Sequence, residues 1–254
     1  MARSAASNVY CVAYFTKSGY NPVGRIALII RLLPQGAAKR SAELSLLDRQ
    51  NFLLRRLHSL TGVVPVGAFL VEHFLTNSFA LGGEEAYNEK VAFLTSLPYL
   101  YVIEALFIFL PIIFHGVLGM WIVFSAEVSV ARHRYLRNWL YFFQRVSGVF
   151  LVAYIAVHVW TTRFAGEENL FRLMEHKLSS PAWLWFYIAG VTAATFHFAN
   201  GLWGFMVTWG ITVSPRAQKW STYACAGVFL AMTFVGVNAL LAFTGDAVTF
   251  LQKQ

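Results

Sequence analysis

Four histidines lie inside long apolar stretches of this 254-residue chain: His73, His115, His158 and His197. His197 is the clearest case, because no Asp, Glu, Lys or Arg occurs from Leu178 to Pro215. An unpaired polar group in an apolar environment costs roughly 2–7 kcal/mol, so each imidazole needs a partner. Imidazole is a common ligand of haem iron and of other metals. A hydrogen bond to a neighbouring helix is the alternative role for any one of them.

The surroundings of these histidines repeat in pairs. The stretches "FHGVLGMW" and "FHFANGLWG" share the motif F-H-x-x-x-G, which places Gly119 after His115 and Gly201 after His197. The stretches "TGVVPVGAFLVEH" and "SGVFLVAYIAVH" both place a Gly-Val ahead of the histidine. Residues four apart on a helix share a face, one turn along. We therefore expect the glycine of each F-H-x-x-x-G to leave room beside the imidazole for something flat and wide.

The elements that must carry these motifs are membrane-spanning helices. The chain is 57% hydrophobic and 13% charged, against about 25% charged residues in a soluble domain. A helix crosses a bilayer with about 20 mostly apolar residues. The predicted fold class is therefore an all-α integral membrane protein whose first four helices form the bundle around the histidines. Five stretches are long enough, at roughly 57–79, 99–125, 139–162, 181–212 and 220–244.

Depth sorts the four histidines into two pairs. His73 and His158 lie near the outer ends of outward-running helices, whereas His115 and His197 lie from mid-membrane to the inner half, at about 1.5 Å per residue. Two imidazoles at one depth on facing helices suit bis-histidine ligation of haem. Four imidazoles around one metal would need a single depth, so we predict two haems. The other histidines are expected elsewhere: His58 at the inner mouth of the first span, and His133 and His176 in solvated loops.

The basic residues indicate the orientation of the chain. Lys and Arg are concentrated before the first span and in the second-to-third and fourth-to-fifth loops. The positive-inside rule then places the N-terminus in the cytoplasm and the C-terminus outside. This placement explains the net charge of +8 better than nucleic-acid binding does. Residues 1–50 are predicted to be a basic extension, flexible or lying on a surface, ahead of a haem-binding domain at 51–254.

Six stretches resemble a known family: "RRLHSLTGVVPVGAFLVEH", "SLPYLYVIEALFIFLPIIFHGVLG", "YLRNWLYFFQRVSGV", "HVWTTR", "FHFANGLWGFMVTWGITVSPRAQ" and "STY". The family is the di-haem, single-subunit cytochrome b anchor of succinate:menaquinone oxidoreductase from Bacillus-like bacteria. The resemblance runs from Arg55 to about Phe243. It implies that His115 and His197 bind the inner, higher-potential haem, and that His73 and His158 bind the outer, lower-potential haem. Glu72 stands where the family leads us to expect glutamine.

The resemblance also implies the partners and the path of electrons. A flavoprotein subunit oxidises succinate, an iron–sulfur subunit passes single electrons on, and this chain carries them through two b haems to menaquinone in the bacterial cell membrane. The chain has no G-x-G-x-x-G after a strand and no cysteine cluster of its own, so it is expected to be an electron-transfer subunit. Candidate counter-charges for the haem propionates are Arg145 with Arg55 or Arg56 on the inner side, and Arg163 on the outer side.

Glu72 and Glu104 are the candidates for the quinone site, because both are acids near the outer membrane boundary and quinone reduction needs protons. Solvation at the interface is the alternative for each. Three other functions stay open at this point. They are an anchor of menaquinol:fumarate reductase, the di-haem anchor of a hydrogenase or formate dehydrogenase, and a haem-free transporter that couples protons through membrane histidines.

Overall fold

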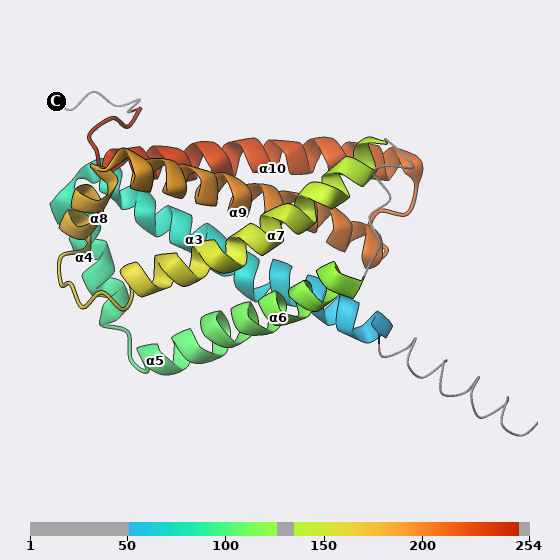
Figure 1. The fold of residues 1–254 in the computed structure, drawn as a ribbon, viewed down its shortest axis with the longest axis horizontal. Coiled ribbons are helices and arrows are strands. Elements are labelled where there is room, and N and C mark those ends of the chain that lie inside the picture. Colours follow the sequence, from blue (N-terminus) through green and yellow to red (C-terminus); the bar gives the residue numbers. More distant parts are fainter. Residues whose placement is uncertain (1–50, 126–134, 249–254) are drawn as a thin grey trace, which may run out of the picture. The chain divides into compact units, whose positions relative to one another are not determined.

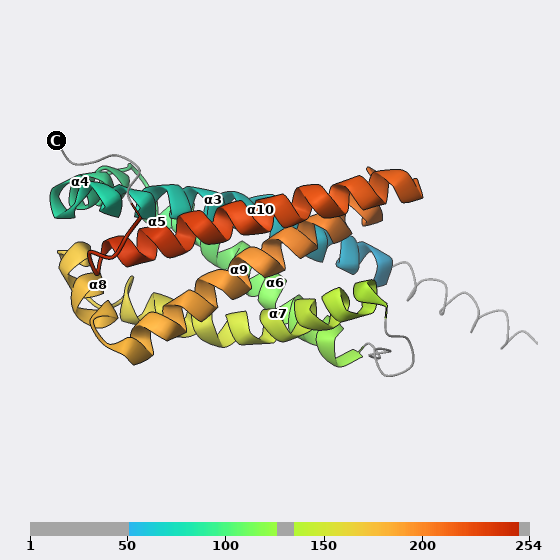
Figure 2. The same ribbon diagram turned by 90° about the horizontal axis from the view of Figure 1, so that it is seen from above.

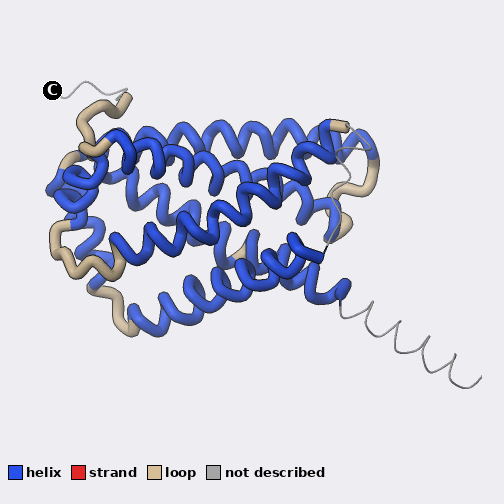
Figure 3. Tube along the Cα trace, viewed as in Figure 1, coloured by secondary structure: helices blue, strands red, loops and turns tan. Residues whose placement is uncertain are grey.

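The computed structural model describes residues 51–125 and 135–248, and within these ranges it contains helices and no strand (Figure 3). The predicted extension at 1–50 and His133 lie outside the described residues. Five helices in these two ranges are long and apolar enough to cross a membrane, which confirms the predicted fold class. These spans are Asn51–Gly82, Leu100–Ser125, Leu136–Thr161, Pro181–Thr208 and Pro215–Ala242.

The first span is built from several consecutive pieces. A helix at 51–63 is followed by α3 (Pro65–Ser78) and by the short 3-10 helix η1 (Phe79–Gly82). Pro65 has no backbone N–H, but the bonds on either side of it continue the helix. Val64 donates to the carbonyl of Leu60 at 2.9 Å, and Ala68 donates to that of Val64 at 3.2 Å. The first span is therefore helical from end to end.

The second span contains a wide turn. It consists of α5 (Leu100–Ile103), the π-helical turn η2 (Glu104–Phe109) and α6 (Leu110–Ser125). The N–H of Leu110 bonds to the carbonyl of Ala105, five residues back. Pro111 follows immediately and lacks the N–H that a regular helix would use. Wide turns of this kind relieve such interruptions of the hydrogen-bond ladder.

The last three spans are single long helices: α7 (Leu136–Thr161), α9 (Pro181–Thr208) and α10 (Pro215–Ala242). The fifth span begins earlier than the predicted 220, because Pro215 takes the first helical turn and the Ser214 hydroxyl accepts from the N–H of Ala217. The fourth ends at Thr208 rather than 212, since the backbone turns at Gly210 with a φ of 71°.

Within the bundle, α9 packs against both α7 and α10, and α10 also packs against α3. Figures 1 and 2 both show α9 and α10 side by side over much of their length. The second span contacts α3 and α7 through η2 and α6, and none of its described residues is fully buried. It is therefore the least enclosed of the five.

The best-packed core lies at one end of the bundle, where α4 (Glu84–Thr95) and α8 (Leu170–Leu178) meet the long helices (Figure 1). Burial there raises the pKa of Tyr87 to about 12. The prediction that His176 lies in a loop was wrong: it is an exposed residue of α8. The buried apolar residues of this core are Ala80, Tyr87, Leu151, Tyr154, Phe171, Met174, Leu178, Tyr187, Leu240 and Phe243.

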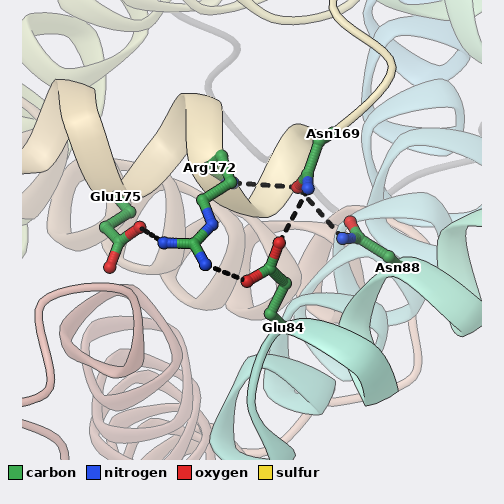
Figure 4. A network of polar contacts seen from close by, with 5 residues as sticks. All are labelled: Glu84, Asn88, Asn169, Arg172 and Glu175. Atoms are coloured by element: carbon green, nitrogen blue, oxygen red, sulfur yellow. Dashed lines mark hydrogen bonds and ion pairs between the residues drawn. The ribbon is translucent and has the colours of Figure 1, made fainter.

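A polar network joins α4 to α8 at this end (Figure 4). Arg172 pairs with Glu84 at 2.6 Å and with Glu175 at 3.0 Å. The Asn169 amide donates to Glu84 at 2.8 Å, and its carbonyl caps α8 by accepting from the N–H of Arg172. The Asn169 hydrogen bond and the Arg172 charge hold the pKa of Glu84 below its ordinary value. The network therefore fixes two loop helices that come from different parts of the sequence.

Replacing Glu84 with Gln should weaken this network mildly, because exposed ion pairs stabilise proteins little. We expect the Tm in detergent at neutral pH to fall by on the order of 2 °C. A carboxylate with a lowered pKa stabilises the fold above its ordinary value of 4.5 and loses that effect as the pH falls through the folded value. The difference between wild type and variant should therefore shrink in acid. Glu89→Gln, at an exposed acid of the same helix, is the control; an equal loss there would contradict the prediction.

Candidate functional site

The inner pair of histidines meets between α6 and α9. The ring centroids of His115 and His197 are 6.1 Å apart, and the ring planes are nearly perpendicular at 86°. The Nδ1 of His115 lies 3.0 Å from the carbonyl oxygen of His58. The Nδ1 of His197 lies 3.1 Å from both the carbonyl oxygen of Gln144 and the hydroxyl of Ser147. A carbonyl oxygen can only accept, so each Nδ1 carries the proton and each Nε2 is left as a possible ligand.

The outer pair meets between α3 and α7. The ring centroids of His73 and His158 are 5.7 Å apart, with an angle of 79° between the planes. The Nδ1 of His158 is 3.3 Å from the hydroxyl of Tyr187. The ring of Tyr154 is nearly parallel to that of His158, at 10° and 5.9 Å between centroids. The outer pair therefore rests on buried aromatic residues of the core beside α8.

The distance between the ring centroids of each pair matches that of two imidazoles with one metal between them. Two ring nitrogens bound on opposite sides of a metal, at about 2 Å each, place the ring centroids roughly 6 Å apart. Among the described residues no cluster of three or more His, Cys, Asp or Glu side chains could hold a metal ion. Each pair thus supplies two ligands only, which suits a haem iron whose remaining four bonds come from the porphyrin.

Glycines allow the helices to approach closely around the inner pair, but not as the sequence predicted. A Cβ on Gly119 would lie 3.0 Å from the ring of His58, and one on Gly201 would lie 3.3 Å from the amide of Gln144. Each glycine therefore receives a side chain from a neighbouring helix, rather than opening space beside the histidine of its own helix. The glycines that border the histidines are Gly62, against His115, and Gly148, against His197.

His58 is the residue that the sequence interpretation missed. We expected it at the inner mouth of the first span, yet its ring is stacked on that of His115, at 4.0 Å between centroids and 11° between planes. A signal was present in the sequence. His58 and Gly62 form another H-x-x-x-G, in the same spacing as His115 with Gly119.

Arg145 lies near the end of α6. It is only 7% exposed, and its Nη2 donates to the carbonyls of Ile122 at 3.4 Å and Val123 at 3.1 Å. These carbonyls belong to the last turn of the helix, where the helix dipole favours a cation. Arg56 likewise donates to the carbonyl of Thr208, at the end of α9. Two of the three inner propionate candidates, Arg145 and Arg56, are therefore already engaged with helix ends.

Arg163, the outer propionate candidate, forms an ion pair with Glu104, one of the two quinone-site candidates. The guanidinium donates to both carboxylate oxygens, at 2.9 and 3.0 Å. Lys177 is a further cation near the outer pair. Its Nζ donates to the carbonyl of Thr161 at 2.6 Å and lies 6.0 Å from the ring centroid of Tyr187. Burial lowers the pKa of Lys177.

Glu72 lines an open pocket of about 680 Å³, to which Glu104 does not contribute. One carboxylate oxygen of Glu72 accepts from the hydroxyl of Thr76 at 2.5 Å. The structure therefore separates Glu72 from Glu104, which the sequence had placed in one group. The pocket is lined by residues of α3, η1 and α4: Glu72, Leu75, Thr76, Ser78, Phe79, Gly82, Ala86 and Lys90.

Comparison with known proteins agrees with the resemblance seen in the sequence. Residues 124–237 match the family model described as succinate dehydrogenase/fumarate reductase transmembrane subunit. The succinate dehydrogenase cytochrome b558 subunit of Bacillus subtilis (strain 168) is 49% identical over 197 residues, which cover 76% of this chain and 98% of that relative. The chain therefore belongs to the family of transmembrane cytochrome b subunits of succinate dehydrogenase and fumarate reductase.

Proposed function

We propose that this chain passes electrons from the iron–sulfur subunit of a succinate dehydrogenase, through two b haems, to menaquinone. As a member of its family the chain is the membrane anchor of succinate dehydrogenase. The observation that carries the proposal is the pair of histidine couples on facing helices, with centroids 6.1 and 5.7 Å apart. Haem iron supplies a one-electron carrier when bound.

The chain's own residues orient the two sites. His115 and His197 would hold the inner haem, and His73 and His158 the outer one. The carbonyls of His58 and Gln144 fix the ring nitrogen that does not bind iron, as outer partners of metal-bound histidines commonly do. Arg145 and Arg163 remain the proposed counter-charges for propionates, and Lys177 joins them on the outer side because of its place beside Tyr187.

We infer the orientation from the charges at the two ends of the bundle. The first span begins with Arg55 and Arg56, α7 begins near Arg137, and α10 begins near Arg216 and Lys219. These helix ends form the basic side, which the positive-inside rule assigns to the cytoplasm. The α4 and α8 end then faces outward, and the flavoprotein and iron–sulfur subunits dock on the basic side.

We place menaquinone reduction at the Glu72 pocket. The pocket combines an acid, Glu72, with a cation, Lys90, and apolar walls that suit a quinone ring. Glu104 is the weaker candidate, because both of its carboxylate oxygens are already bonded to Arg163 and it does not line the pocket. Glu72 would hold and deliver a proton to a quinone oxygen.

Replacing Glu72 with Gln should slow succinate:quinone turnover at least about tenfold, the range in which positioned acid–base groups act. The reduced-minus-oxidised spectra of both haems should persist, because no haem ligand is changed. Turnover is measured with a water-soluble menaquinone analogue in the purified complex. Glu104→Gln is the comparison: if it slows turnover and Glu72→Gln does not, the pocket is not the quinone site.

A spectrum and a subunit analysis test the proposed function as a whole. The purified complex should show low-spin b-type haem, at two per copy of this chain, in a dithionite-reduced minus oxidised spectrum. It should also contain a flavoprotein and an iron–sulfur protein. Absence of haem overturns the electron-transfer role and favours a proton-coupled transporter. Co-purification with a hydrogenase or formate dehydrogenase would contradict the choice of enzyme.

A further inference from the structure

Two helix pairs in this protein interlock in the same reciprocal way. In the first pair, the ring of His58 faces Gly119 of α6, and the ring of His115 faces Gly62 of the helix at 51–63. In the second pair, the side chain of Gln144 faces Gly201 of α9, and the ring of His197 faces Gly148 of α7. In each pair, both helices carry a polar residue with a glycine four positions later. The polar side chain of one helix faces the glycine of the other helix.

The two helix pairs also share a contact between a backbone carbonyl and the inner histidine. The carbonyl of His58 lies 3.0 Å from Nδ1 of His115, and the carbonyl of Gln144 lies 3.1 Å from Nδ1 of His197. The spacing in the sequence agrees: His58 precedes Gly62 as Gln144 precedes Gly148. His58 and Gln144 therefore occupy equivalent places in two halves of an internal repeat.

The two halves differ in what else holds the inner histidine. His197 has a second polar contact, with the Ser147 hydroxyl at 3.1 Å. The residue equivalent to Ser147 is Thr61, whose hydroxyl donates instead to carbonyls of its own helix, those of Leu57 and His58. His115 has no such hydroxyl among the described residues, but the parallel ring of His58 covers it at 4.0 Å.

We propose that His58 is a positioning residue whose stacked ring fixes the rotation of the His115 imidazole, the role that Ser147 plays for His197. Without the ring of His58, His115 keeps the hydrogen bond between its Nδ1 and the His58 carbonyl. That single bond does not fix the angle of the imidazole plane. This inference rests on the proposed haem ligation by His115 and His197. His58 itself binds no iron in it.

The measurement is the electron paramagnetic resonance of the oxidised complex. The largest g value of a low-spin ferric haem depends on the angle between its two axial ring planes, which is 86° for His115 and His197. In His58→Leu the g value of the inner haem should shift while that of the outer haem stays in place. His58→Phe keeps a flat ring and should return the inner signal close to that of the wild type. His176→Leu, at an exposed residue of α8, is the control.

A second pair of variants tests the same proposal if the His58→Leu protein does not accumulate. Alanine at Gly119 would press on the ring of His58, whereas alanine at Gly116 of the same helix meets nothing within 4 Å among the described residues. Gly119→Ala should shift the inner signal and Gly116→Ala should not.

The outcomes separate this inference from the proposed function. An unmoved inner signal in His58→Leu, or in Gly119→Ala when His58→Leu does not accumulate, overturns the positioning role of His58. An equal shift in His58→Phe and His58→Leu overturns the role of stacking. A wild-type complex without haem overturns the proposed function itself.

Discussion

Replacing His197 with Ala should remove the inner haem and leave the outer haem in place. His115→Ala should give the same result, because an iron that loses one of two axial ligands is held by one helix only. The haem content should fall from two to one per chain, measured by the pyridine haemochrome. The remaining haem should keep the redox potential and the electron paramagnetic resonance signal of the outer site.

Combining the variants tests the pairing. A double replacement of His115 and His197 should lose no more haem than either single one, since residues that act on one site are not additive. A double replacement of His115 and His158 should lose both haems. If His115→Ala and His73→Ala instead abolish the same signal, the pairing by the distances of 6.1 and 5.7 Å is wrong.

The second large effect is expected from Gly190→Ala. Gly190 is buried in α9, and an added Cβ would overlap three ring atoms of Tyr154. Tyr154 is itself 8% exposed and stacks on His158, so the ring cannot move without displacing the outer histidine. Overpacking of this kind costs about 1–3 kcal/mol of folding free energy. We expect a lower Tm and loss or weakening of the outer haem signal, with the inner one retained.

Gly204→Ala is the matched control for that prediction. Gly204 lies on the same helix, and a Cβ there meets nothing within 4 Å among the described residues. Thermal unfolding and the reduced spectrum should both match the wild type. Equal losses in Gly190→Ala and Gly204→Ala would show that the effect belongs to α9 as a helix rather than to the contact with Tyr154.

The sequence predicted the five spans because hydropathy and helix period are local properties. The ends of the spans were predicted less accurately, because they depend on single residues such as Ser214 and Gly210. The approach of His73 to His158, and of His115 to His197, could be anticipated from depth alone. Depth counts residues from a membrane boundary and needs no knowledge of how the helices cross.

The partners of the glycines could not be predicted in the same way. Which side chain fills the space beside Gly119 depends on the crossing of two helices, and the answer is His58. The ion pair of Glu104 and Arg163 joins residues 59 positions apart, and neither residue carries a local sign of the other. Lys177 was visible as a charge, but its approach to Tyr187 depends on the fold of α8.

The wide turn at Glu104–Phe109 has a consequence for insertions and deletions in this chain. One residue in a regular helix accounts for about 100° of rotation. The turn accommodates one extra residue, so the direction in which Glu104 points about the helix axis is not tied to the direction of His115 by the regular helical spacing. Deleting one residue between 105 and 109 would return this segment to a regular helix, so that Glu104 would still face Arg163 and His115 would still face His197. A change of one residue in this turn therefore leaves the orientation of His115 unchanged. The same change between His115 and Gly119 would rotate His115 relative to Gly119 about the helix axis.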